Sequence, residues 1–187
     1  MRAHDGDMFD DEAMTLSLRA ALEHHVDGLK LLSEYQPNTR KTQRENWRYA
    51  NYYEAVLDLG QEFLGEKRPK GVWKKPYRQC FRNSSRAVFD HGWAYVEGYA
   101  MSEHGLMVEH AWNLTPDGHV VDLTWRRPEK SLYYGIVIDQ ETVSRLLVYH
   151  QVFGIIPEDW RIGAPLLKEG LFIPSTGLPP KEESWRS

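Results

Sequence analysis

The sequence is poor in cysteine, because Cys80 is the only cysteine among 187 residues. A single cysteine excludes an intramolecular disulfide, and a free thiol suits a reducing compartment. Long hydrophobic runs are also missing. No stretch approaches the length of a membrane span, and the amino end lacks an apolar signal region. We therefore expect a cytoplasmic protein without a membrane partner.

A strong excess of either charge is absent as well. The 23 basic and 27 acidic residues give a net charge of −4, which argues against a generally basic nucleic-acid binder. Eight histidines are present, yet no His-Glu-x-x-His helix and no paired-cysteine motif accompanies them. We expect neither a metal nor a cofactor.

The length and a hydrophobic content of 41% predict one domain with a real core. We expect a mobile acidic leader over residues 1–12, a single domain over 13–175 and a carboxyl-terminal tail over 176–187. Apolar spacing predicts three helices outside the cysteine region, over residues 11–35, 39–64 and 140–153. Gly65 is the expected stop of the second helix and Asp139 the expected cap of the third. Glycine and proline residues from 163 onward predict coil.

The clearest local pattern is a β-hairpin around Pro116-Asp117-Gly118. Proline presets the backbone angle of the turn and glycine accepts the left-handed conformation, which is typical of a three-residue loop. Such a loop places Thr115 opposite His119. Because side chains alternate between faces, His110 and Asp122 then become diagonal neighbours on one face. A two-residue turn would shift the register by one and separate them.

Cys80 has a different setting. The residues from Phe81 to Phe89 predict a short helix that begins at Cys80. Backbone NH groups are unpaired at a helix N-terminus and the helix dipole is positive there, so this position favours a thiolate. Four basic residues nearby in the sequence add positive charge, namely Lys74, Lys75, Arg78 and Arg82.

Cys80, His110 and Asp122 together supply a soft nucleophile, an imidazole that can take its proton, and a carboxylate that can orient the imidazole. Each residue also has a structural interpretation when it is considered alone. Cys80 could be a buried thiol, His110 a core histidine that donates to a backbone carbonyl, and Asp122 a hydrogen-bonded residue at a strand end. The shared face of His110 and Asp122 favours the catalytic interpretation.

A cysteine that opens a helix, a strand with His110-Ala111-Trp112 and a strand with Val121-Asp122-Leu123-Thr124 resemble the transglutaminase-like superfamily over residues 77–138. The resemblance implies an α+β fold like that of papain-like cysteine peptidases. That fold has amino-terminal helices, a helix opened by the nucleophilic cysteine and an antiparallel sheet. Residues 95–100 and 134–138 fit the flanking strands.

The same resemblance implies a role for each member of the triad. Cys80 would be the nucleophile, His110 the general base and acid, and Asp122 the group that orients His110. Several further residues are candidates for an oxyanion site or a pocket wall. Gln79 could donate its amide to a developing oxyanion, and Trp112 and Trp125 are expected as core or pocket wall. The remaining pocket candidates are Asn83 and Glu97.

The loop over residues 67–78 carries six basic residues. One interpretation is a solvated connector. The other is a binding site for an anionic substrate or a nucleic-acid backbone, in which the interleaved aromatic residues stack on a base. The candidate substrate-binding residues are Trp73, Lys74, Lys75, Tyr77 and Arg78.

We expect a cysteine-dependent amide-bond hydrolase or acyltransferase that works through an acyl-enzyme intermediate. Its partner would be a protein or small molecule that bears an acyl or amide group. Two alternatives stay open. One is a non-enzymatic module on the same fold that binds protein or nucleic acid. The other is an N-acyltransferase that takes its acyl group from a thioester, as arylamine acetyltransferases do with a similar triad.

Overall fold

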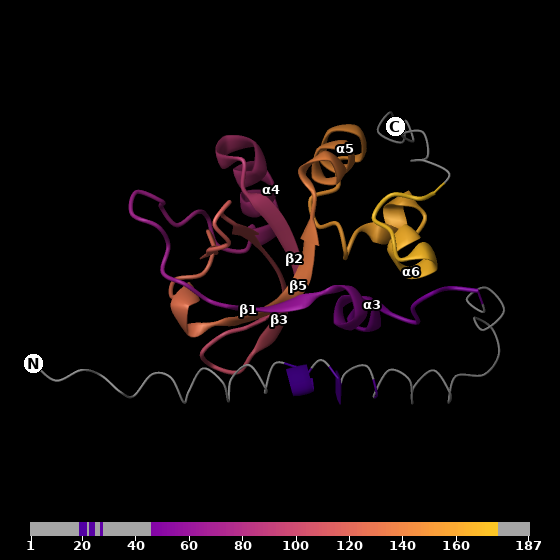
Figure 1. The fold of residues 1–187 in the computed structure, drawn as a ribbon, viewed down its shortest axis with the longest axis horizontal. Helices are drawn as coiled ribbons and strands as arrows, with labels where there is room; N and C mark the ends of the chain where they lie inside the picture. The colour runs from indigo at the N-terminus through magenta and orange to yellow at the C-terminus, as the bar shows by residue number, and fades with distance from the viewer. Residues whose placement is uncertain (1–18, 22, 25–26, 28–45, 176–187) are drawn as a thin grey trace, which may run out of the picture.

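The computed structural model is an α+β fold built on one curled antiparallel sheet, so the expected α+β class with an antiparallel sheet is confirmed (Figure 1). It describes residues 19–21, 23–24, 27 and 46–175. The strand order is β1-β5-β2-β3-β4. The strands are β1 Gln61–Leu64, β2 Ala94–Met101, β3 Met107–Leu114, β4 Val120–Val121 and β5 Leu132–Ile138.

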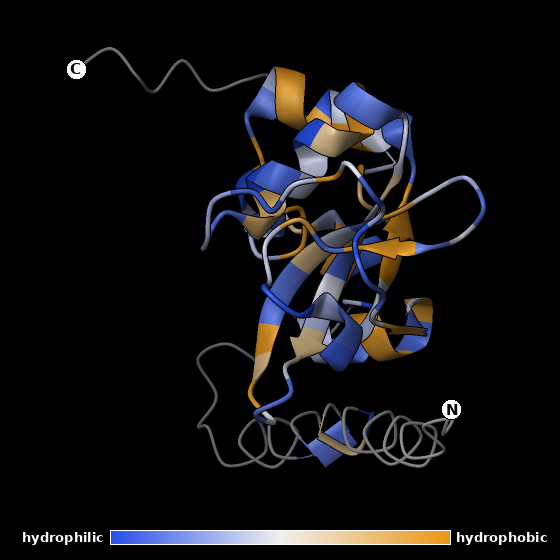
Figure 2. Cartoon of the chain, turned by 90° about the vertical axis from the view of Figure 1, so that its left-hand side faces the viewer, coloured by the Kyte–Doolittle hydropathy of each residue, from blue (hydrophilic) through white to orange (hydrophobic). Residues whose placement is uncertain are grey.

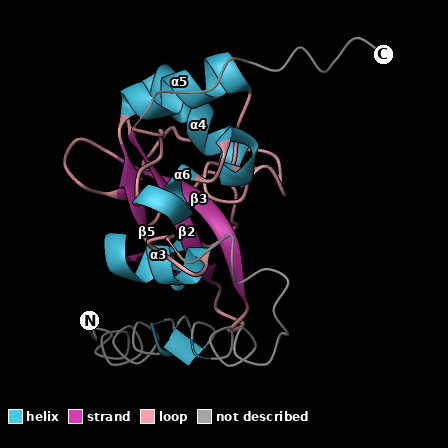
Figure 3. Ribbon diagram, turned by 90° about the vertical axis from the view of Figure 1, so that its right-hand side faces the viewer, coloured by secondary structure: helices cyan, strands magenta, loops and turns pink. Residues whose placement is uncertain are grey.

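Helices cover one face of this sheet. Val88 of one helix and Leu146 of another share a core with Tyr95 on β2, whereas Val56 and Leu166 pack beside Tyr99. Figure 3 shows α4 (Cys80–His91) and α5 (Gln140–His150) together at one end of the sheet and α3 (Tyr52–Leu59) at the other. Hydrophobic and hydrophilic residues mix along these helices, as is typical of helices with one buried side (Figure 2). The helices are α3 Tyr52–Leu59, α4 Cys80–His91, α5 Gln140–His150 and α6 Pro165–Glu169, with 3-10 turns at Pro128–Lys130 and Asp159–Ile162.

The opposite face of the sheet carries a cluster of buried aromatic residues. Trp112 and Tyr133 lie at its centre, with Trp125 packed against them. Gly98 and Gly135 are paired directly across β2 and β5, and Gly135 leaves room for this cluster. A Cβ atom on Gly135 would lie 2.5 Å from the indole of Trp112. The absence of a side chain at Gly135 therefore leaves the space that the indole of Trp112 occupies.

The hairpin of β3 and β4 has the predicted loop and register. The NH of Thr115 donates to the carbonyl of His119 (3.0 Å), and Gly118 has a φ of +89°. Asn113 pairs with Val121 in the ladder, in agreement with a three-residue turn. The ladder is shorter than expected, because β4 contains only two residues. Asp122 and the residues after it lie outside the strand.

The helix predicted over residues 39–64 is wrong in its extent. Within the described residues, the helix begins only at Tyr52, where the side chain of Asn51 accepts from the NH of Glu54 (3.0 Å). It ends at Gly60 and not at Gly65, and residues 61–64 form β1. Pairing of β1 with the distant strand β5 overrides the helical spacing of the apolar residues.

The helix predicted over 140–153 is confirmed from residue 140 to His150, and Asp139 caps it by accepting from the NH of Thr142 (2.8 Å). The coil predicted from residue 163 is wrong over Pro165–Glu169, which form α6. Proline fits there because it occupies the first turn of the helix, where its missing NH group costs nothing.

The division into a leader, a single domain and a tail stays a prediction. The leader over residues 1–12, the tail over 176–187 and most of the helix predicted over 11–35 lie outside the described residues. In the part of the chain that is described, no helix combines the length and the apolar character needed to cross a membrane.

Candidate active site

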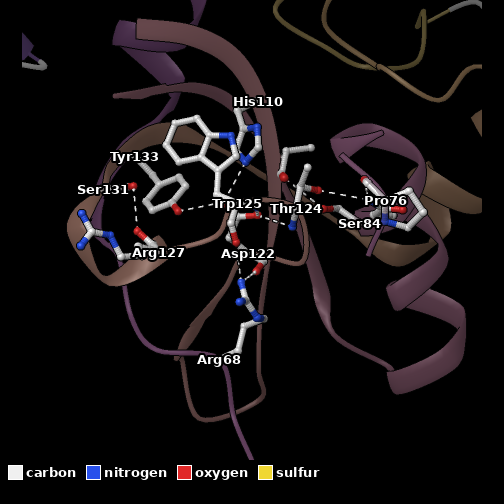
Figure 4. A network of polar contacts seen from close by, with 12 residues as sticks. Arg68, Pro76, Ser84, His110, Asp122, Thr124, Trp125, Arg127, Ser131 and Tyr133 are labelled. Carbon is white, nitrogen blue, oxygen red and sulfur yellow. Dashed lines mark hydrogen bonds and ion pairs between the residues drawn. The ribbon is translucent and has the colours of Figure 1, made fainter. Parts of the chain in front are cut away.

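His110 on β3 and Asp122, just after β4, form a buried pair (Figure 4). Nε2 of His110 lies 2.9 Å from Oδ2 of Asp122, and their side chains are 2% and 0% exposed. The hairpin register therefore brings both side chains to one face, as the sequence predicted. Since Nε2 faces Asp122, Nδ1 is the nitrogen through which His110 can exchange a proton with another group.

The carboxylate of Asp122 accepts four hydrogen bonds. Oδ2 accepts from His110 and from the hydroxyl of Tyr133 (2.9 Å), and Oδ1 accepts from the NH groups of Thr124 (2.7 Å) and Trp125 (3.0 Å). Burial by itself raises the pKa of a carboxyl. Here the donors and the charge of His110 outweigh burial, so the pKa of Asp122 lies below its ordinary value. Asp122 is therefore a fixed anion.

The pKa of His110 is shifted in the opposite direction. Burial disfavours the charged imidazole, but the hydrogen bond and the negative charge of Asp122 outweigh burial. An interaction with the side chain of Cys80 adds to the same effect, and the pKa of His110 rises to about 9. At neutral pH the buried pair is therefore an imidazolium beside a carboxylate.

Cys80 is the first residue of α4, as predicted, and its side chain is partly exposed. Gln79 is the N-cap residue, but its side chain caps no NH group of the helix. Cys80 therefore lies at the N-terminal end of α4, where the helix dipole is positive. A side-chain interaction between Cys80 and the imidazole contributes to the raised pKa of His110, so these two side chains lie next to each other. The structure brings the three predicted triad residues together.

Asn83 fixes the start of α4 to the chain that follows Asp122. Its amide donates to the carbonyl of Pro76 (2.9 Å) and to the hydroxyl of Thr124 (3.1 Å). One residue later, the hydroxyl of Ser84 donates to the carbonyl of Ala111 on β3 (3.0 Å). Asn83, a candidate pocket residue, lines a cavity of about 120 Å³, and its amide also positions the helix beside the histidine strand.

The two candidate tryptophans have different places. Trp112 is fully buried and packs against Tyr133, so it is core, as one of its two interpretations predicted. The ring of Trp125 lies 4.5 Å from the ring of His110, between centroids. Trp125 also lines a cavity of about 340 Å³, together with Tyr77 and Leu106. Trp125 is thus a wall between the imidazole and an open cavity.

The basic loop lies along the same cavity. Lys74 and Tyr77 line it, and the guanidinium of Arg78 lies 5.7 Å from the ring of Tyr77. Trp73 projects into solvent and is 81% exposed. Lys75 faces a second, smaller cavity beside Gln79. The loop therefore brings positive charge and aromatic surface to two cavities, which are lined by residues next to the triad, Gln79, Thr124 and Trp125, and not by the triad itself.

Glu97 is not open to solvent, because it is buried among groups that hold it. Its carboxylate accepts from the hydroxyl of Tyr95 (2.5 Å) and from the NH groups of Ile155 (2.8 Å) and Ile156 (2.7 Å). Burial raises the pKa of Glu97 to about 8 despite these donors. The candidate pocket residue instead attaches residues 155–156 to the sheet.

Sequence reasoning missed two residues that hold Asp122 in place. The hydroxyl of Tyr133 donates to its carboxylate, and the guanidinium of Arg68 donates to the carbonyls of Asp122 (3.1 Å) and Trp125 (2.6 Å) (Figure 4). Tyr133 comes from β5, which is not a neighbour of β4 in the sheet. Local sequence patterns carry no signal for that contact. A partly buried arginine within a basic loop is equally hard to predict.

No group of three or more histidine, cysteine, aspartate or glutamate side chains in the described ranges is placed to hold a metal ion. A scan of the chain against protein-family models gives no match, and neither do searches of curated proteins and of solved structures.

Proposed function

We propose that this protein is a thiol hydrolase or acyltransferase whose catalytic triad is Cys80, His110 and Asp122. The observation that carries the proposal is the buried ion pair of His110 and Asp122 beside a cysteine at a helix N-terminus. The resemblance of these three segments to transglutaminase-like proteins, and through them to a papain-like core, supports the same assignment.

The reaction begins when the thiolate of Cys80 attacks the carbonyl carbon of an amide or ester. A carbon–sulfur bond forms, and the carbonyl oxygen becomes an oxyanion that the NH of Cys80 can stabilise. The carbon–nitrogen or carbon–oxygen bond then breaks, and the imidazolium of His110 gives its proton to the leaving group. An acyl-enzyme remains.

The second half of the reaction reverses these proton movements. Neutral His110 takes a proton from water or from an acceptor amine as that nucleophile attacks the acyl-enzyme. The carbon–sulfur bond breaks and the thiolate of Cys80 is restored beside the imidazolium. Asp122 keeps the imidazole in the orientation and tautomer that both halves require, because its Oδ2 faces Nε2.

The test uses 4-nitrophenyl acetate, a reactive ester that needs little substrate recognition. We expect a burst of one nitrophenolate per protein molecule and an acetyl group on Cys80, located by mass spectrometry of the intact protein and its peptides. Cys80→Ala should abolish the burst. His110→Gln should slow acylation by about 100-fold or more, because general acid–base catalysis supplies roughly that factor. His150→Gln on α5 is the matched histidine control.

If Cys80 is not acetylated, or is acetylated equally fast in the His110→Gln variant, the proposal is wrong. The chain would then be better described as a binding module.

A further inference from the structure

A second cavity, of about 120 Å³, lies along α4 and is also lined by residues 75–76 and by Leu123. Gln79, Arg82 and Arg86 line it from the helix, and Lys75 lines it from the basic loop. Positions 79, 82 and 86 lie close to one stripe of the helix, because three or four residues make about one turn. The four side chains are exposed. Gln79, one of its lining residues, directly precedes Cys80, which does not line the cavity itself.

The positive charges at this cavity have no partner in the described part of the chain. Most described arginines elsewhere are paired: Arg48 with Asp58, Arg127 with Glu103 and Arg161 with Glu158. Arg82 and Arg86 form no such ion pair, and like charges four residues apart on a helix repel each other. Asp90 is the one acidic side chain that lines the cavity. An oxyanion bound there would offset this repulsion.

We propose that this cavity binds a phosphate group of the substrate, which would make the acyl substrate a phosphorylated small molecule. That the bound molecule is an acyl substrate rests on the proposed function. That the cavity binds phosphate rests on the lining residues and their charges. Guanidinium groups match a phosphate through paired hydrogen bonds, and Lys75 adds a point charge. The amide of Gln79 can donate to the same group. The phosphate would then lie beside the first turn of α4, with the acyl carbon at Cys80.

The first experiment measures binding without catalysis. Pyrophosphate is titrated into the Cys80→Ala variant by calorimetry, and the titration is repeated with Arg82→Gln and Arg86→Gln combined. Glutamine preserves helix propensity, so circular dichroism should show an intact fold. We expect the double variant to weaken binding by about ten-fold or more, since charge-assisted hydrogen bonds are lost. Arg145→Gln on α5 is the matched control and should bind like the parent.

The second experiment compares turnover of two nitrophenyl esters whose acyl chains end in a phosphate or in a hydroxyl group. The wild type should have a KM about ten-fold lower for the phosphate ester, and the double variant should lose that preference. Equal KM values together with no pyrophosphate binding would overturn the phosphate site and leave the proposed function intact. Arginine-dependent binding of pyrophosphate without turnover of either ester would support the phosphate site and refute the proposed function.

A third titration separates the small molecule from nucleic acid. Binding of single-stranded DNA that becomes tighter with each added nucleotide, with no binding of pyrophosphate, would assign the surface to a nucleic-acid backbone and overturn the proposal.

Discussion

Replacement of Asp122 by asparagine should lower stability in a way that depends on pH. The folded protein holds the pKa of His110 at about 9, above its ordinary 6.5, because of Asp122. A histidine whose pKa is raised in the folded state adds to the free energy of unfolding. This contribution has its full value below about pH 6.5 and is lost as the pH rises through about 9. The shift corresponds to roughly 3 kcal/mol of unfolding free energy. Asp122→Asn removes this contribution, so its cost should be about 3 kcal/mol larger near pH 6 than near pH 10.

Urea unfolding at both pH values measures that difference. Tyr133→Phe is the matched control, because it removes a donor to the same carboxylate and leaves the charge in place. Its cost should be about 1 kcal/mol at either pH. NMR titration of the His110 ring in the wild type provides a check that does not depend on the variant folding. The reasoning is refuted if Asp122→Asn costs the same at both pH values, or if His110 titrates at or below its ordinary value.

Three further predictions concern other parts of the site. His110→Gln should slow alkylation of Cys80 by iodoacetamide at neutral pH by about ten-fold, measured by mass spectrometry, because the variant removes the positive charge beside the thiol. The raised pKa of Glu97 means that the folded state binds one more proton than the unfolded state between about pH 4.5 and about 8, so the free energy of unfolding of the wild type should fall as the pH rises through this range. Glu97→Gln should remove this fall, measured by urea unfolding. Gly98→Ala should cost about 3 kcal/mol or more in the same assay, because its Cβ atom would lie 2.2 Å from the carbonyl oxygen of Tyr134; an unchanged midpoint would contradict the close approach.

The parts of the site that could be predicted depend on local chemistry. The turn residues Pro116-Asp117-Gly118 fix the register of the hairpin, and the register fixes the face shared by His110 and Asp122. The helix that begins at Cys80 likewise follows from the residues next to it. These features need no information from distant parts of the chain.

The parts that could not be predicted depend on distant contacts. Residues 61–64 have helical spacing, yet they pair with β5, where Phe63 lies opposite Tyr133. The same strand β5 supplies the hydroxyl that holds Asp122. Glu97 has apolar neighbours on β2. Nothing in that pattern indicates that the NH groups of residues 155–156 will donate to its carboxylate. Pairing partners of this kind are set by the whole fold.

The way in which α4 is attached has a consequence for the order of folding. Twelve residues separate His110 from Asp122, whereas the Asn83–Thr124 contact that places α4 spans 41 residues. Closing the longer loop costs more chain entropy, so we expect the acid–base pair to form before the nucleophile joins it. Thiol reactivity during refolding, followed by pulsed alkylation, should therefore rise after the hairpin has formed. Cys80, the only cysteine in the sequence, would lie away from His110 until the last long-range contacts have formed. A partly folded molecule would therefore carry a less reactive thiol than the folded protein.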